Sequence, residues 1–149
     1  MSIGDAGLSA RAAQVLYAYA RAVDEGDIEA LRRLALPDVL LTRSDGTKQG
    51  IEAFLDLYRA FAASQAGGSK HAITNVQAYP EQDGVHALSY FQATMFDPGT
   101  QARLVIGQYS DSMREVDGQL RFTHKRITVQ RVVTIPSGTT HYADVRASA

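Results

Sequence analysis

The amino-terminal part of the chain carries apolar residues at the spacing of an amphipathic helix. From about residue 9 to residue 25 they recur every three or four positions and therefore share one face. These positions are Ala12, Leu16, Tyr19, Ala20 and Val23. Ser9 is predicted to cap the start of this helix and Gly26 to end it, because serine favours the N-cap and glycine the position after the last turn.

Two further helices are predicted before residue 65. Asp27 is placed to cap a short helix over residues 28–35, and Pro37 stops it because proline cannot continue a helix. Apolar residues at helical spacing predict the third helix over residues 51–64. Its inward stripe consists of Phe54, Leu55, Tyr58 and Phe61.

The remaining pattern is typical of strands. A short strand is predicted at residues 38–42, followed by a turn at 44–47, and four long runs are predicted over residues 71–79, 85–96, 102–116 and 119–132. The Asp117-Gly118 pair between the last two runs is a strong hairpin signal. In the last run the apolar residue Phe122 is even-numbered and Ile127 odd-numbered, so a regular strand would place them on opposite faces of the sheet. A β-bulge near residues 124–126 is therefore predicted, because one extra residue would return both to the same face.

Helices first and antiparallel strands afterwards is the order of an α+β fold. We expect one domain over residues 1–149, with a core at about 8–132 and a carboxyl-terminal tail. Three helices packed on a strongly curved, mainly antiparallel sheet of about six strands would form a cone. Its open mouth would enclose a largely apolar pocket, because pockets form readily in such mouths.

Composition narrows the classes of function. The 149 residues contain no cysteine, and their net charge is −1 with both signs scattered, which argues against disulfides, thiolate metal sites and a nucleic-acid-binding patch. No apolar run approaches the roughly 20 residues that span a bilayer. No signal-peptide pattern, metal-ligand spacing or nucleotide-binding motif is present. We therefore expect a soluble, cytoplasmic protein with a small-molecule substrate, no cofactor, no bound metal, and neither nucleic acid nor membrane as a partner.

Three residues are candidates for chemistry, and each also has an ordinary structural interpretation. Asp24 lies in the last turn of the first helix, where an acid opposes the helix dipole, yet it could be a solvated surface residue. His71 alternates with Ile73 and Asn75 on one strand face, where a lone histidine is more often structural. Tyr19 falls on the buried stripe, so it is either a core aromatic or a hydrogen-bond donor to a substrate oxygen.

Four segments together resemble the nuclear transport factor 2-like superfamily. They are residues 19–31, 34–40 and 70–76, and the hairpin at 117–118. Within that superfamily the chain is similar to the SnoaL-like branch of small polyketide cyclases and dehydratases, which includes scytalone dehydratase. The resemblance implies a cystatin-like α+β cone, but the fold hosts many activities and does not specify one.

The resemblance also implies how the three candidates would act. Dehydratases of this branch pair an aspartate at the end of the first helix with a histidine that begins the strand after the third helix, and here those positions are Asp24 and His71. A carboxylate bonded to one imidazole nitrogen fixes the tautomer, so that the other nitrogen can act as a general base. Tyr19 would polarise the substrate oxygen. Arg43 stands where a ketosteroid isomerase has its base, which makes that isomerase reaction less favoured.

The pocket is expected to be lined from several elements. The candidate lining residues are Phe54, Tyr58, Asn75, Phe91, Met95, Tyr109, Arg43 and Arg126. Aromatic and methionine residues at these spacings also suit a plain core, and the two arginines also suit solvated positions. Asn75 would either orient His71 or bond to the backbone.

The predicted activity is that of a cofactor-free acid–base enzyme, a dehydratase, isomerase or cyclase, which acts on a small apolar substrate. The alternative is a non-catalytic scaffold or ligand-binding subunit, such as a ring-hydroxylating dioxygenase β-like subunit. The sheet face away from the pocket is expected to form a homodimer or homotrimer through apolar positions such as Val76, Ala78, Leu104 and Ile106.

Overall fold

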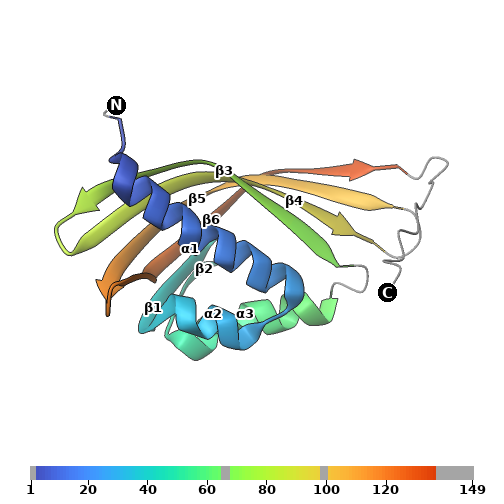
Figure 1. Cartoon of the computed structure of the whole chain (residues 1–149). Helices are drawn as coiled ribbons and strands as arrows, with labels where there is room; N and C mark the ends of the chain where they lie inside the picture. The colour runs from blue at the N-terminus through green and yellow to red at the C-terminus, as the bar shows by residue number, and fades with distance from the viewer. Residues whose placement is uncertain (1–2, 65–67, 98–100, 137–149) are drawn as a thin grey trace, which may run out of the picture.

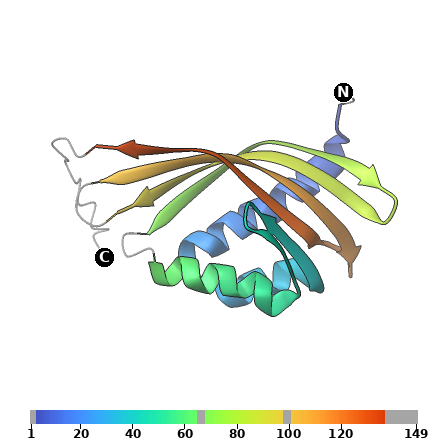
Figure 2. The same ribbon diagram turned by 180° about the vertical axis from the view of Figure 1, so that it is seen from behind.

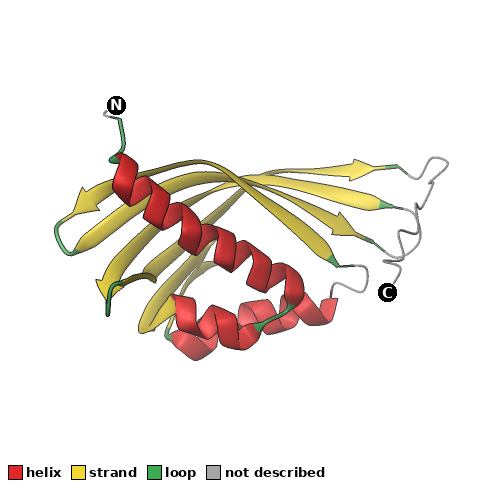
Figure 3. Cartoon of the chain, viewed as in Figure 1, coloured by secondary structure: helices red, strands yellow, loops and turns green. Residues whose placement is uncertain are grey.

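The computed structural model describes residues 3–64, 68–97 and 101–136, and these residues form three helices and six strands (Figure 1). The helices are α1 (Ala6–Glu25), α2 (Ile28–Leu34) and α3 (Ile51–Ser64). They lie together against one face of a curved sheet, as the colouring by secondary structure makes plain (Figure 3). The predicted α+β class, with helices on one side of a bent sheet, is confirmed.

The sheet is mixed, with one parallel pair. Its strands are β1 (Ala35–Arg43), β2 (Gly46–Gln49), β3 (Ser69–Glu81), β4 (Gly84–Phe96), β5 (Ala102–Val116) and β6 (Gln119–Ile135). Their order across the sheet is β2-β1-β6-β5-β4-β3, and every neighbouring pair is antiparallel except β1 with β6. Seen from behind, the sheet arches over the helices (Figure 2). α1 lies along β3, the strand at one edge of the sheet, because Ser9 bonds to Ala78 near one end of the helix and Asp24 bonds to His71 at the other.

The first helix begins earlier than the sequence pattern predicts. Asp5 is its N-cap and accepts a hydrogen bond from the Leu8 backbone N–H at 2.8 Å, so the prediction of Ser9 as the cap is wrong. Ser9 Oγ instead accepts a hydrogen bond from the Ala78 backbone N–H, which fixes the helix to the edge of β3. Gly26 ends the helix as predicted, in the left-handed conformation at φ 67°.

The region between α2 and α3 differs from the prediction in two ways. Asp27 caps α2 as predicted, but the helix ends at Leu34, one residue before the predicted end, and β1 starts directly after it. The short strand β2 is antiparallel to β1, and their pairing starts with Arg43 opposite Gly46 and ends with Leu40 opposite Gln49. The sequence pattern predicts only a turn in this region. Every residue of β2 is exposed, so its sequence carries no alternation of apolar and polar side chains.

Two bulges shape the last strand. Ser112 pairs with His124 and Met113 with Phe122, so Thr123 is left over, one residue before the predicted bulge. Because of this extra residue, Phe122 and Lys125 both face the core although they are three positions apart. At a second register shift Ile106 pairs with Arg131 and Gly107 with Val129, so Gln130 is left without a partner on β5.

The apolar core lies between the helices and the concave face of the sheet. It includes Leu16, Phe54, Leu55 and Phe122, none of which is exposed to solvent. No helix among the described residues is long and apolar enough to cross a membrane. β6 continues to Ile135, three residues beyond the predicted end of the core at 132, and the rest of the predicted tail, from residue 137, lies outside the described residues.

Candidate functional site

Asp24 and His71 meet at the end of α1. The imidazole Nδ1 lies 2.6 Å from Asp24 Oδ1, and the His71 backbone N–H donates to Asp24 Oδ2 at 2.8 Å. Ser69 Oγ donates to Asp24 Oδ1 at 2.7 Å. The two side chains are 8% and 9% exposed. The carboxylate is therefore nearly withdrawn from water, and three donors hold it in place.

The local sequence explains this contact. Gly26 ends α1 two residues after Asp24, so the carboxylate projects from the last turn. His71 lies near the start of β3, one of the two edge strands of the sheet, where its backbone N–H has no neighbouring strand to pair with on the helix side. Asp24 Oδ2 accepts the hydrogen bond that a backbone carbonyl of a neighbouring strand would otherwise accept. The same aspartate thus anchors the edge of the sheet and fixes the imidazole.

The imidazole ring is positioned by two phenylalanines. Its centroid lies 6.2 Å from the Phe61 ring on α3 and 6.4 Å from the Phe91 ring on β4. Among the described residues Nε2 has no hydrogen-bond partner, whereas Nδ1 is engaged by Asp24. Nε2 is therefore the nitrogen left available for a proton from a bound molecule.

One hollow is lined by both residues of this pair, and a second is lined by Asp24 alone of the two. One, of about 740 Å³, lies along α1 and β3 and includes Asp24 and His71 in its lining. The other, of about 220 Å³, lies between the ends of α1 and α3 and includes Asp24, Phe61 and Ser69. Both volumes are in or near the range of small-ligand sites. None of the eight residues predicted to line the pocket belongs to either hollow.

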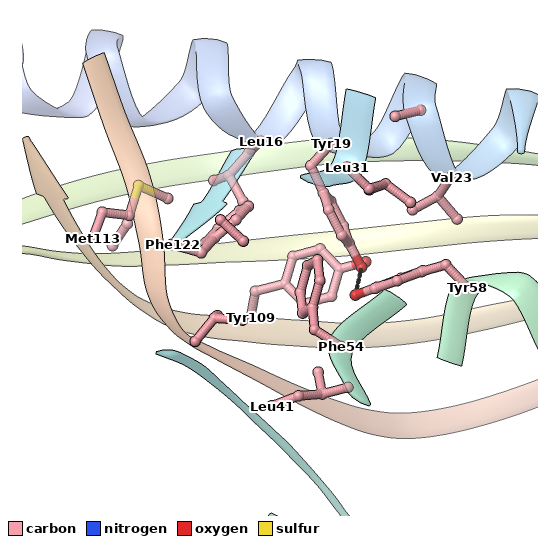
Figure 4. Packing of buried hydrophobic residues seen from close by; sticks show 14 of the residues in the cluster. Leu16, Tyr19, Val23, Leu31, Leu41, Phe54, Tyr58, Tyr109, Met113 and Phe122 are labelled. Atoms are coloured by element: carbon pink, nitrogen blue, oxygen red, sulfur yellow. Dashed lines mark hydrogen bonds between the residues drawn. The ribbon is translucent and has the colours of Figure 1, made fainter. Parts of the chain in front are cut away.

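Tyr19 lies in the packed core. Its hydroxyl shares a 2.9 Å hydrogen bond with the Tyr58 hydroxyl, and both side chains are almost fully buried (Figure 4). Burial raises the pKa of both phenols above their ordinary value. Tyr19 also meets the Tyr109 ring edge to face at 5.8 Å. Its predicted role as a donor to substrate stays a prediction.

The predicted aromatic lining fills the concave side of the sheet. Phe91 stacks on Tyr109 at 4.4 Å, and Phe54 meets Tyr58 at 5.0 Å. Met95 is also buried, on the same face of β4 as Phe91. Gly107 leaves space for this stack, because a Cβ there would lie 2.6 Å from the Phe91 ring.

A family model describes the same region of the chain. The model of the SnoaL-like domain matches residues 8–126, which is most of the sequence and nearly all of the described fold. The chain belongs to the SnoaL-like domain family. The predicted resemblance to this branch of the nuclear transport factor 2-like superfamily is confirmed. A comparison with curated proteins gives no significant sequence match.

Solved structures share the fold of this SnoaL-like domain at low sequence identity. A scytalone dehydratase candidate from Novosphingobium aromaticivorans superposes with a TM-score of 0.74 and 17% identity, covering 86% of this chain and 87% of that chain. Hexachlorocyclohexane dehydrochlorinase LinA-type3 from Novosphingobium barchaimii gives 0.74 and 19%, covering 87% and 90%. An aromatic ring hydroxylase candidate from N. aromaticivorans gives 0.73 and 19%, covering 85% and 92%. At these identities the likeness concerns the fold.

The polar residues predicted for the pocket lie apart from the dyad of this SnoaL-like domain. Asn75 is exposed, with φ 54°, at a register shift between β3 and β4, so it makes no contact with His71. Arg43 is exposed at the end of β1. Arg126 donates from Nη1 to the Ser110 carbonyl and to Ser112 Oγ, at 3.2 and 3.3 Å.

Sequence reasoning missed a buried ion pair in the SnoaL-like core. Lys125 Nζ lies 2.8 Å from Asp111 Oδ2, and both side chains are fully buried. The ammonium also lies 3.3 Å from the centre of the Tyr109 ring and 4.4 Å from that of Tyr19. Burial lowers the pKa of Lys125 to about 8, although Asp111 opposes this shift. The sequence does contain a sign of this burial: the inward-facing residues of β6 change from even-numbered to odd-numbered positions at the bulge, which turns Lys125 inward.

The described part of the SnoaL-like domain holds no group of three His, Asp or Glu side chains arranged to bind a metal ion.

Proposed function

We propose that this protein is a cofactor-free acid–base enzyme in which His71 removes a carbon-bound proton from a small, largely apolar substrate. The observation that supports this is the Asp24–His71 hydrogen bond of 2.6 Å, with Nε2 unpartnered among the described residues and a hollow lined by both side chains. The reaction would be a dehydration, a double-bond shift or a ring closure. Each of these begins with loss of a proton next to an activating group.

Asp24 has two roles in this proposal. By accepting from Nδ1 it keeps that nitrogen protonated, so that Nε2 carries the lone pair. When Nε2 takes the substrate proton, the ring becomes a cation beside a fixed carboxylate that is only 9% exposed. In a site of low dielectric this pairing stabilises the transition state more than it would in water. Ser69 and the His71 backbone N–H hold the carboxylate in place before substrate binds.

The proposal is tested by proton exchange, which needs no knowledge of the natural product. The protein is incubated in D₂O with a panel of small cyclic ketones and β-hydroxy ketones, and loss of the α-proton signal is followed by NMR. We expect exchange of at least one panel member above the buffer rate, and a loss of about 10²–10⁴-fold in His71→Ala, the usual range for a general base. Exchange at the same rate in His71→Ala and in the wild type would contradict the assignment of His71 as base.

The alternative function is a non-catalytic scaffold or ligand-binding subunit of the same fold. The packed aromatic interior around Tyr19 and Tyr109 favours it, because a filled cone holds less substrate there. A scaffold predicts exchange at the buffer rate across the whole panel, together with a lower melting temperature in His71→Ala.

We also expect self-association through the outer face of the sheet. The residues that face outward there and are apolar include Leu88, Tyr90, Phe96, Leu104, Ile106 and Val133. Ala78 cannot contribute as predicted, because it is fully buried beneath the start of α1, and Val76 packs partly against the core. Light scattering at micromolar concentration should give a homodimer or homotrimer mass, and Tyr90→Glu should shift it toward the monomer. A monomeric wild type would contradict this expectation.

A further inference from the structure

Three groups on one short segment of β3 converge on the Asp24 carboxylate. Ser69 Oγ and His71 Nδ1 both contact Oδ1, at 2.7 and 2.6 Å, and the His71 backbone N–H donates to Oδ2 at 2.8 Å. Ser69 and His71 are two positions apart, so their side chains lie on the same face of the strand. Their partners on β4, Met95 and Ala93, are buried, so this face is the one that packs against the helices.

We propose that Ser69 is a positioning residue of the dyad. Its hydroxyl holds Asp24 Oδ1 against Nδ1 of His71 and thereby keeps the ring proton on Nδ1, with the lone pair on Nε2. This inference rests on the proposed function in that it takes Nε2 as the atom that accepts the substrate proton. Ser69 acts through Asp24 and does not itself touch the substrate.

The backbone hydrogen bond alone does not fix the carboxylate of Asp24. It engages only Oδ2, and the terminal torsion of an aspartate is broad and roughly two-fold, so the group could still turn about its Cβ–Cγ bond. Ser69 restricts this rotation, because its hydroxyl engages the other oxygen from a residue that is only 3% exposed. Oδ1 therefore faces Nδ1 before any substrate is bound.

The burial of the carboxylate gives the hydroxyl a second effect. Among the described residues Asp24 pairs with no arginine or lysine, and its side chain is 9% exposed. While the imidazole is neutral, the charge is therefore balanced by neutral donors alone, of which Ser69 is one. A buried charge is costly unless it is hydrogen-bonded, and hydrogen bonds to ionised groups are about twice as strong as those between neutral groups. Ser69 thus helps to keep the carboxylate ionised and able to accept from Nδ1.

A carboxylate that turns away from the ring would release its tautomer. Without a fixed acceptor at Nδ1, the proton of the neutral imidazole can occupy either nitrogen. When the proton is on Nε2, the lone pair lies on the Asp24 side of the ring, and His71 cannot take a proton from a substrate. Loss of the Ser69 hydroxyl should therefore change the protonation pattern of the ring as well as the rate.

A matched pair of substitutions separates the hydroxyl from the shape of the side chain. Threonine keeps the hydroxyl, valine replaces it with a methyl group of similar size, and both residues suit a strand. Ser69 lines the hollow of about 220 Å³ between the ends of α1 and α3, which leaves room for the added methyl group. Ser69→Thr should therefore keep the contact with Asp24, and Ser69→Val should lose it.

The ¹⁵N chemical shifts of the neutral His71 ring report which nitrogen carries the proton, and they need no substrate. The chain has four histidines, so the His71 signals are identified by their loss in His71→Ala. We expect the wild type and Ser69→Thr to show the Nδ1-protonated ring. In Ser69→Val the two nitrogen shifts should move toward each other, because both tautomers are then populated.

The rate should change in the same variants. In the D₂O exchange assay Ser69→Val should be about tenfold slower than the wild type, as loss of one hydrogen bond to a charged group allows. Ser69→Thr should stay close to the wild-type rate. Ser69→Ala should behave as Ser69→Val does, and it takes the place of that variant if the valine protein does not fold.

Ser9→Ala is the control for a merely structural effect. Ser9 Oγ accepts from the Ala78 backbone N–H at 2.9 Å and fixes the other end of α1 to β3. Ser9→Ala should lower the melting temperature without changing the His71 ring shifts or the exchange rate, whereas Ser69→Ala should change both.

Failure of this inference and failure of the proposed function give different results. If His71 is not the base, exchange stays at the buffer rate in every protein, while the ring shifts still differ between Ser69→Thr and Ser69→Val. Identical ring shifts in these two variants would overturn the inference, even where His71-dependent exchange remains. A Ser9→Ala protein whose ring shifts change as much as those of Ser69→Ala would also overturn it.

Discussion

Replacing Lys125 with methionine should lower the free energy of unfolding by about 3–5 kcal/mol, the usual cost of removing one partner from a buried ion pair. The Asp111 carboxylate would keep only the hydrogen bond from the Arg126 backbone N–H at 3.1 Å. Methionine retains most of the volume of the lysine stem, so the loss would report the charge rather than a cavity. Unfolding in urea, followed by circular dichroism, measures it.

The double variant Lys125→Met, Asp111→Leu tests whether the loss comes from the stranded carboxylate. With both charges removed, most of the stability should return, since buried pairs can often be replaced by apolar side chains of similar size. Lys48→Met, on exposed β2, is the matched control and should change stability by less than about 0.5 kcal/mol. A Lys125→Met protein as stable as the wild type would contradict the account.

The same pair gives stability a pH dependence of defined sign. Burial lowers the pKa of Lys125 to about 8, so between pH 8 and the ordinary value of 10.5 only the unfolded chain holds that proton. The contribution of Lys125 to stability therefore rises across this interval, and Lys125→Met should lack the rise. Burial raises the pKa of Asp111, so its contribution is present below pH 3.8 and is lost as the pH rises through the folded-state value.

Replacing Asp24 with asparagine should slow His71-dependent proton exchange by about 10²–10⁴-fold while the protein stays folded. The amide nitrogen can donate to Nδ1, which moves the ring proton to Nε2 and removes the lone pair that takes the substrate proton. The amide oxygen can still accept one of the hydrogen bonds from Ser69 and the His71 backbone. The measurement is the D₂O exchange assay, with circular dichroism to verify folding.

Asp27→Asn is the control for that substitution. Asp27 lies three residues further on and caps α2, and asparagine caps a helix about as well as aspartate, so neither rate nor stability should change much. The double variant Asp24→Asn, His71→Ala should be no slower than His71→Ala, because the two residues act as a unit. Additive losses would show that Asp24 acts on exchange by a separate route.

The sequence predicts those features that depend on local periodicity and capping. The three helices, the long strands, Gly26 and the Asp117-Gly118 hairpin all follow from spacing and turn chemistry. The short strand β2 has no such signal, because an exposed edge strand buries nothing that would impose alternation. The N-cap was misplaced because Asp5 and Ser9 both suit the role, and only the contact with Ala78 distinguishes them.

The site was harder to predict because its members come from distant parts of the chain. The candidates Asp24 and His71 are 47 positions apart, and only the family resemblance suggested that they pair. The Tyr19–Tyr58 hydrogen bond and the filled interior depend on how α1, α3 and β5 pack together, which no single segment encodes. The residue type alone gives no sign that Lys125 is buried, because lysine side chains are rarely removed from water.

The two bulges of β6 have a consequence for comparing this chain with relatives that lack them. Each adds one residue without lengthening the partner strand, so the inward position changes parity after Thr123 and again after Gln130. An alignment without gaps at these two points would match Lys125, which faces the core, with a side chain of a relative that faces outward. It would likewise match Arg126, which faces outward, with a side chain that faces the core. Positional equivalence along this strand should therefore be assigned by which side chain faces the helices.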